Sequence, residues 1–230
     1  MYNDAIAALG AATKGEMLPD RGNSLLYVSS TLQIPCGYAM DGRCAYLVAG
    51  SPHGISAVVG TGAITLGLSD HTSHRAAGWG PAFRDGGCGY DIGQRGLAAA
   101  AESTDGRGPR SALQEDLPRA CRVDSMLEVM RWAYTQPQSW FRIASIAPAV
   151  IQCAAAGDGV ACGVLRDGAA EVVKSVKAVW TRVADTSSSP LPLVLSGGLL
   201  NDEKNVMYCD MVTQQLQQAL PAHDILWCAS

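Results

Sequence analysis

The turn Gly60-Thr61-Gly62 has the residue types of a phosphate-binding loop, and the carboxylate of Asp85 follows it closely in the chain. A turn of two glycines around a hydroxyl can offer backbone N–H groups to an anion, because no Cβ stands in the way. The same tripeptide is also common in ordinary tight hairpins, so both interpretations stay open at this point. With a carboxylate nearby, the pattern indicates a site where a phosphate donor could meet a hydroxylated acceptor.

A second glycine block surrounds that carboxylate. Gly78-Trp79-Gly80-Pro81 breaks the regular periodicity, and Asp85 comes shortly before an alanine-rich run, residues 96–102, that predicts a helix. Asp85 could cap this helix or accept hydrogen bonds in an Asx turn. Its alternative role is to accept hydrogen bonds from the hydroxyl groups of a substrate.

These residues need strands to position them. Residues 55–59 predict a buried strand, Gly60-Thr61-Gly62 its turn, and residues 63–68 the returning strand. A further apolar strand, residues 191–195, turns into a helix at Ser196-Gly197-Gly198. From the residues alone, the glycine pair is typical of an ordinary strand-to-helix turn.

The remaining pattern predicts helices around a sheet. Apolar residues recur at helical spacing over residues 123–134, 139–156, 160–183 and 201–220, followed by a closing strand at residues 225–227. We expect Pro148 to kink the second helix and Asn201 or Asp202 to cap the last one. The order of elements predicts an α/β fold in which a mixed sheet is flanked by helices, as in a ribonuclease H-like lobe.

Composition narrows the classes of protein. The 230 residues are 48% hydrophobic and 17% charged, which is enough for one sizeable core. The net charge of −4 indicates no nucleic-acid partner and no membrane surface, and neither a long apolar span nor a signal peptide is present. The eight cysteines form no C-x-x-C pair, so we expect reduced thiols, no metal site and a cytoplasmic location.

Five blocks, taken in order, resemble the N-acetylglucosamine kinases. These kinases belong with the BadF/BadG/BcrA/BcrD ATPases in the superfamily of sugar kinases, actin and Hsp70. Each block alone is weak, whereas their order along the chain is specific. The blocks are Asn3-Asp4-Ala5, Val59-Gly60-Thr61-Gly62, Gly78-Trp79-Gly80-Pro81 with Asp85 and Gly89-Tyr90, Asp105-Gly106-Arg107-Gly108-Pro109, and Leu195-Ser196-Gly197-Gly198.

The resemblance implies a reaction and its substrates. The chain would transfer the γ-phosphoryl group of ATP, with Mg²⁺, to a hydroxyl of an amino sugar such as N-acetylglucosamine. Asp4 would be the general base. The residues implied in binding the sugar, besides Asp4, are Gly78, Trp79, Gly80 and Asp85.

The resemblance also implies where ATP binds. Thr61 and its flanking glycines would hold the terminal phosphates. The segment 139–144 is similar to a family helix whose small residue approaches the nucleotide, and Ala144 stands at that position. The residues implied in binding ATP are Gly60, Thr61, Gly62, Ala144, Gly197 and Gly198.

The chain also departs from the family pattern. Only three residues precede Asp4, and a phosphate-binding Asp-Gly-Gly-Gly-Thr-like hairpin of the first lobe is lacking. We therefore expect an actin-like ATPase C-terminal lobe at residues 55–230, a hinge remnant with the base-bearing helix at residues 1–15, and an atypical insertion or loop at residues 16–54. Arg84 and Gly86 replace residue types that relatives often carry beside Asp85, which affects the shape of the sugar pocket.

Two other functions remain open at this point. One is an activator-type ATPase of 2-hydroxyacyl-CoA dehydratases, a class that holds an iron–sulfur cluster between two subunits through cysteines. The other is an inactive fragment or a binding module. A homodimer is compatible with each of these interpretations.

Overall fold

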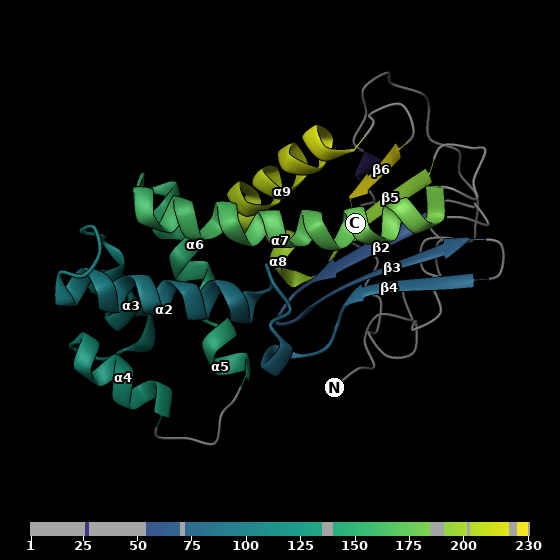
Figure 1. Ribbon diagram of the computed structural model, residues 1–230. Helices are drawn as coiled ribbons and strands as arrows, with labels where there is room; N and C mark the ends of the chain where they lie inside the picture. The colour runs from purple at the N-terminus through teal and green to yellow at the C-terminus, as the bar shows by residue number, and fades with distance from the viewer. Residues whose placement is uncertain are drawn as a thin grey trace.

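The computed structural model describes residues 26–27, 54–69, 72–134, 140–184, 191–201, 203–220 and 225–229. Its centre is one mixed sheet, with helices packed beside it and continuing beyond one end of it (Figure 1). The strand order is β1-β6-β5-β2-β3-β4. The bounds are β1 Leu26–Tyr27, β2 Gly54–Val59, β3 Ala63–Ser69, β4 Thr72–Ala77, β5 Leu191–Ser196 and β6 Ile225–Ala229.

The sheet changes from parallel to antiparallel pairing at β2. β1, β6, β5 and β2 run parallel to their neighbours, whereas β2, β3 and β4 form an antiparallel meander. In the parallel pair β2 and β5, Val58 lies opposite Ser196. Both strands therefore end at the same edge of the sheet, and the residues that follow them are neighbours there.

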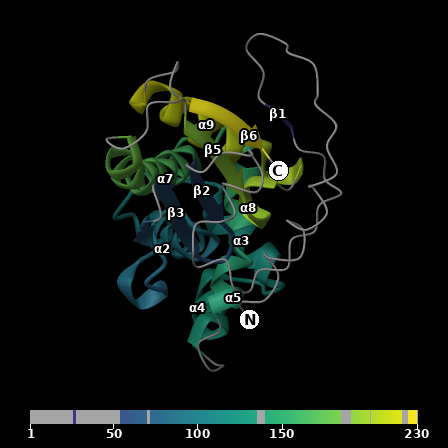
Figure 2. The same ribbon diagram turned by 90° about the vertical axis from the view of Figure 1, so that its right-hand side faces the viewer.

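A long helix, α7 (Gly159–Ala184), packs across β2, β3 and β4, and α9 (Val206–Ala219) lies alongside it (Figures 1 and 2). One face of α7 carries an apolar stripe, and all of its members are buried: Val172, Val176, Val179 and Val183. Gly67 on β3 allows this close packing, because a Cβ there would collide with the side chains of Val179 and Val183. The helix thus fixes the meander that carries the Gly60–Gly62 turn.

The other helices form a layer that extends beyond the sheet edge. Helix α2 (Gly89–Asp105) is its centre and contacts α3 (Leu113–Cys121), α5 (Trp140–Ala144), α6 (Ala147–Ala155) and α7, with α4 (Met126–Tyr134) against α3. Short helices complete the described chain: η1 (Pro81–Phe83), α8 (Gly198–Asn201) and η2 (Glu203–Asn205). Among the described residues, no helix combines the length and the apolarity needed to cross a bilayer.

The expected strands at residues 55–59, 63–68, 191–195 and 225–227 are confirmed, as is the helix at residues 160–183. The mixed sheet flanked by helices is confirmed as well. The helix expected at residues 123–134 begins at Met126, and the sequence pattern had not singled out α3. Residues 1–15, and residues 16–54 apart from 26–27 and 54, lie outside the described residues.

Two expected helices are each divided in the structure. From residue 140 on, the helix expected at residues 139–156 is divided into α5 and α6, and Pro148 sits in the first turn of α6 rather than kinking a continuous helix. Proline is tolerated there because first-turn N–H groups have no partner within the helix. Residues 201–220 form the end of α8, η2 and α9, so Asn201 belongs to α8 and Asn205 takes the N-cap position of α9. Asp202 lies outside the described residues.

Candidate active site

The Gly60–Gly62 hairpin rests on the N-terminus of α2. The Gly60 carbonyl accepts a hydrogen bond from the N–H of Gly89 at 2.7 Å, and the Thr61 carbonyl accepts one from the N–H of Tyr90 at 3.1 Å. These are two of the helix N–H groups that lack a partner inside the helix. The hairpin is therefore fixed by backbone contacts, while Gly62 at its tip is exposed.

Gly197 and Gly198 lie beside this hairpin at the end of β5. A Cβ on Gly197 would lie 2.7 Å from both the backbone nitrogen and the carbonyl carbon of Val59, and its φ is +104°. Gly198 has open space around its Cβ direction, and its N–H nitrogen would be 3.9 Å from a Cβ on Gly60. Two strand ends thus place two side-chain-free segments of backbone next to each other.

The carboxylate of Asp85 also lies beside the hairpin. Its side chain is buried, with 6% of the residue exposed, and a Cβ on Gly62 would lie 3.9 Å from Oδ2. Oδ1 accepts from the Trp79 N–H at 2.9 Å, and Oδ2 accepts from the Gly80 N–H at 2.8 Å. Because an ionised carboxylate has about four acceptor positions, each oxygen retains capacity for a further donor.

Asp85 is therefore not the cap of α2. Cys88 occupies that position, and its Sγ accepts a bond from the Asp91 N–H at 3.4 Å. Asp85 instead folds back onto the Gly78–Gly80 loop, which precedes it in the chain. These bonds run to N–H groups five and six residues earlier in the chain rather than to an Asx turn, so they stabilise the loop and not the helix.

Two aromatic rings at the surface flank this loop. Trp79 and Phe83 are 66% and 74% exposed, and their ring centroids are 6.4 Å apart. The guanidinium of Arg75 on β4 stacks over the Trp79 ring at 4.3 Å from its centroid. Such a cation–π contact orients the ring, and it leaves an aromatic surface next to the Asp85 carboxylate.

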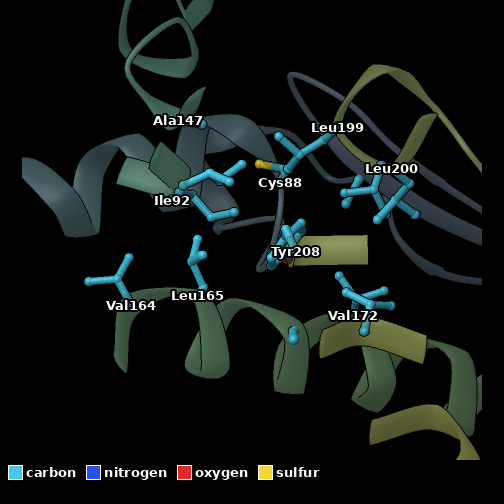
Figure 3. Close-up of a cluster of buried hydrophobic side chains, with 14 of the residues drawn as sticks. Cys88, Ile92, Ala147, Val164, Leu165, Val172, Leu199, Leu200 and Tyr208 are labelled. Carbon is cyan, nitrogen blue, oxygen red and sulfur yellow. The ribbon is translucent and has the colours of Figure 1, made fainter. Parts of the chain in front are cut away.

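Buried side chains pack against the turn that follows Asp85. Figure 3 shows Cys88, Ile92, Leu165, Val172 and Tyr208 in one cluster, where α2, α7 and α9 meet. The Tyr208 hydroxyl donates to the Gly87 carbonyl at 2.6 Å, and burial raises its pKa. Burial also raises the pKa of the Cys88 thiol to about 11, so this thiol stays protonated and unreactive near neutral pH.

The structure brings most of the candidate residues together. The hairpin, the Gly78–Gly80 loop with Asp85, and Gly197-Gly198 share one end of the sheet. Ala144 lies close to them at the start of α2. A Cβ added to Gly89, whose N–H is bonded to the hairpin, would be 3.4 Å from the Cβ of Ala144. Asp4 lies outside the described residues.

Several residues that shape this region were not singled out by the sequence pattern. Tyr208 comes from a helix more than a hundred positions downstream, so no local signal points to it. Asn205 is buried, and its Nδ2 approaches the Gly198 carbonyl at 3.4 Å. The sequence does contain a signal for Asp91. This residue lies three positions after the Cys88 cap, in the first turn of the helix, and four positions before Arg95, the spacing of a helical ion pair.

An apolar pocket of about 740 Å³ lies elsewhere, between α2, α4 and α5. Leu97, Met126, Met130 and Trp140 are among its lining residues, and none of the candidate residues above lines it. Concavity alone would have drawn attention to this pocket. The convergence of exposed backbone and a carboxylate at the sheet edge is the better guide to chemistry.

Comparison with known proteins identifies relatives for nearly the whole chain. Residues 38–225 match the BadF/BadG/BcrA/BcrD ATPase family. An N-acetyl-D-glucosamine kinase of Dictyostelium discoideum is 29% identical over 228 residues, which are 98% of this chain and 60% of the relative. An N-acetylmuramic acid/N-acetylglucosamine kinase of Clostridium acetobutylicum is 33% identical over 150 residues, 65% of this chain and 49% of the relative. The chain thus spans 60% or less of the length of these two relatives.

Solved structures show the same fold. A candidate N-acetylglucosamine kinase from Chromobacterium violaceum superposes with a TM-score of 0.59 at 28% identity, over 80% of this chain and 60% of that one. A similar candidate from Porphyromonas gingivalis also gives 0.59, at 16% identity, over 81% of this chain and 59% of that one. These likenesses confirm the expected fold class, that of the actin-like ATPases, and the family match confirms the resemblance based on the sequence blocks.

Proposed function

The chain belongs to the BadF/BadG/BcrA/BcrD ATPase family, and from this premise we propose that it acts as an N-acetylglucosamine kinase. The reaction is transfer of the γ-phosphoryl group of ATP to a hydroxyl of the amino sugar. The names of both relatives above contain this sugar, which favours a kinase over an activator ATPase or an inactive module.

One observation carries this proposal. The tip of the Gly60–Gly62 hairpin and the Asp85 carboxylate are neighbours, with 3.9 Å between a Cβ on Gly62 and Oδ2 of Asp85. A phosphate held by the hairpin and a hydroxyl bound by Asp85 would therefore meet with little intervening space. Phosphoryl transfer depends mainly on such positioning of donor and acceptor.

For the remaining candidate residues, we propose the roles that the family resemblance implies. Gly60, Thr61 and Gly62 hold the phosphates, while Gly197, Gly198 and Ala144 border the nucleoside. Trp79 and the backbone of Gly78 and Gly80 line the sugar pocket with Asp85. Asp4 is the general base that accepts the proton of the sugar hydroxyl.

Mg²⁺ accompanies ATP in this proposal. In proteins, Mg²⁺ keeps several waters and takes one or two carboxylates together with the phosphates of the substrate. In the described part of the chain, no three His, Cys, Asp or Glu residues gather into a metal-binding group. The ion would be held mainly by the ATP phosphates, whose charge it would neutralise. We also place the protein in the cytoplasm, where ATP is available and thiols stay reduced.

Titration calorimetry with N-acetylglucosamine and with a non-hydrolysable ATP analogue tests the binding part of this proposal. Both ligands should bind the full chain, and Asp85→Asn should weaken sugar binding while nucleotide binding stays within twofold. Asp210→Asn, an exposed carboxylate on α9, is the matched control. Absence of sugar binding to the wild-type chain would reject the kinase proposal.

Catalysis is tested by sugar-dependent formation of ADP, with and without a relative's first lobe fused upstream. We expect the fusion to be the more active form, because this chain spans 60% or less of the length of the two relatives above and a site closed from both sides excludes water and orients the donor. In the fusion, Asp4→Asn should lower kcat by roughly 10²–10⁴-fold, the range for loss of a general base. Turnover of the Asn variant at the parental rate would show that Asp4 is not the base.

A further inference from the structure

We propose that Asp91 is a positioning residue for sugar recognition, an inference that rests on the function proposed above. Asp91 holds the turn that carries Asp85, and through that turn it fixes the Gly78–Gly80 loop. Asp91 acts through Arg84 and Gly87, which lie on either side of Asp85 in the chain.

The Asp91 carboxylate grips the turn at two points. Oδ1 accepts from Nε of Arg84, the residue before Asp85, at 3.2 Å. Oδ2 accepts from the N–H of Gly87, two residues after Asp85, at 2.9 Å. The Tyr208 hydroxyl donates to the carbonyl of Gly87, so both the N–H and the carbonyl of this residue are held by side chains.

Asp91 is itself held rigidly. Only 1% of the residue is exposed, and it lies in the first turn of α2. Nε of Arg95, one helical turn further on, donates to Oδ2 at 2.9 Å, which supplies the compensating charge that a buried carboxylate needs. A carboxylate fixed to a helix in this way transmits the position of the helix to the turn.

The turn has little freedom of its own to adopt another shape. Arg84 has φ +59°, and Gly87 has φ +81° with no room for a Cβ, which would meet the Gly168 carbonyl. Asp85 lies between them, and each of its oxygens already holds one loop N–H, from Trp79 or Gly80. Movement of the turn by an ångström would therefore disturb both the carboxylate and the loop, and recognition depends on placement at this scale.

A simpler role for Asp91 would be to stabilise the N-terminus of α2 by its charge. Asp91→Asn separates the two roles. If Asp91 positions the turn, the Kd for N-acetylglucosamine should rise roughly tenfold, the effect of weakening a charge-assisted hydrogen bond, while the Kd for the ATP analogue stays within twofold. Amide hydrogen exchange should accelerate at Trp79 and Gly80 but not at Ala57 in the core strand β2.

Two further variants complete the experiment. Arg84→Gly keeps the fold, because glycine adopts a positive φ without strain. It should weaken sugar binding roughly twofold to fivefold, the range for an ion pair in which one partner, here Arg84, is exposed. Asp167→Asn is the control. It removes only the outer ion pair of Arg95, at 3.6 Å, and should leave sugar binding and exchange unchanged.

Each outcome decides the proposal. Unchanged exchange at Trp79 and Gly80 in Asp91→Asn, or exchange that rises equally at Ala57, would overturn it. If Asp91→Asn does not fold, an Arg84→Gly variant with wild-type sugar affinity and wild-type exchange at Trp79 would overturn it too. If the wild-type chain does not bind N-acetylglucosamine, the proposed function fails, and the exchange comparison alone decides the role of Asp91.

Discussion

At the scale of single residues, Gly197 and Gly198 are adjacent glycines with different reasons to be glycine. Gly197 must lack a side chain because its φ is +104° and Val59 backbone atoms fill its Cβ position. Gly198 meets neither constraint, since its Cβ direction is open. Packing explains the first glycine, whereas no atom of the described residues explains the second, as we expect if a ligand approaches there.

The two alanine variants should therefore behave differently. Gly197→Ala should lower the free energy of unfolding by about 2–4 kcal/mol through backbone strain and overpacking. Gly198→Ala should change stability by less than about 0.5 kcal/mol, yet weaken binding of an ATP analogue roughly tenfold by filling the space of the nucleotide. Urea unfolding and calorimetry measure the two quantities. Wild-type nucleotide affinity in Gly198→Ala would remove this residue from the proposed site.

Gly62 offers a similar contrast at the hairpin tip. Its Cβ direction points toward Asp85, so Gly62→Val would place a branched side chain between the phosphate and sugar positions. We expect nucleotide-analogue affinity to fall at least roughly tenfold with the fold intact, because Gly62 is exposed and a Cβ there meets only ordinary contact. Gly163→Val, on α7 with open space around it, is the control. Equal affinities of the two variants would contradict the phosphate-binding role of the hairpin.

At the scale of elements, Asp158 joins the starts of two helices. Its Oδ1 accepts from the Ala161 N–H in the first turn of α7 at 2.8 Å, and its Oδ2 accepts from the Ala112 N–H just before α3 at 2.8 Å. The Ser111 hydroxyl donates to Oδ1 at 3.0 Å. Burial favours the neutral acid, but these hydrogen bonds outweigh it and lower the pKa of Asp158.

Asp158→Ala should therefore lower the free energy of unfolding at pH 7 by about 1–2 kcal/mol, the usual cost of losing a helix cap. Because the carboxyl pKa is lower in the folded state, this stabilisation exists above the ordinary carboxyl pKa and disappears as the pH falls through the folded value. The difference between variant and wild type should shrink below about pH 4 in urea titrations. Asp210→Ala, an exposed carboxylate on α9, should show neither effect. A difference that stays constant down to pH 2 would contradict the charge-dependent cap.

The elements also show what local sequence can and cannot predict. The hairpin was predictable because strand alternation and a glycine turn are local signals, and α7 because its apolar stripe is long and regular. The break between α5 and α6 at residues 145–146 was not predicted, because a proline such as Pro148 is compatible both with a kink inside one helix and with the first turn of a new helix. The partners of Asp85 were missed for another reason. A carboxylate before a helix usually caps it, and only the tertiary structure shows that this one turns back to the Trp79 and Gly80 amides.

At the scale of the whole molecule, the site depends on segments that are distant in sequence. The hairpin belongs to the antiparallel meander, Gly197-Gly198 to the parallel part of the sheet, and Ala144 to the helical layer. Helix α2 supports the hairpin and lies against Ala144. A ligand that contacts these segments binds the folded state and not the unfolded chain. Ligand binding should therefore raise global stability.

Thermal or urea unfolding in the presence of each ligand tests this dependence. At 100 times its Kd, either an ATP analogue or N-acetylglucosamine should add about 2.7 kcal/mol to the free energy of unfolding. At the same ligand concentration, Gly62→Val should remove at least about half of the nucleotide contribution, the effect of a tenfold loss of affinity. Asp85→Asn should lower the sugar contribution more than the nucleotide contribution, because its carboxylate binds the Gly78–Gly80 loop. If both variants lost both contributions, the hairpin and the Asp85 loop would form one indivisible site. If neither ligand stabilised the wild-type chain, this edge of the sheet would not be the site of binding.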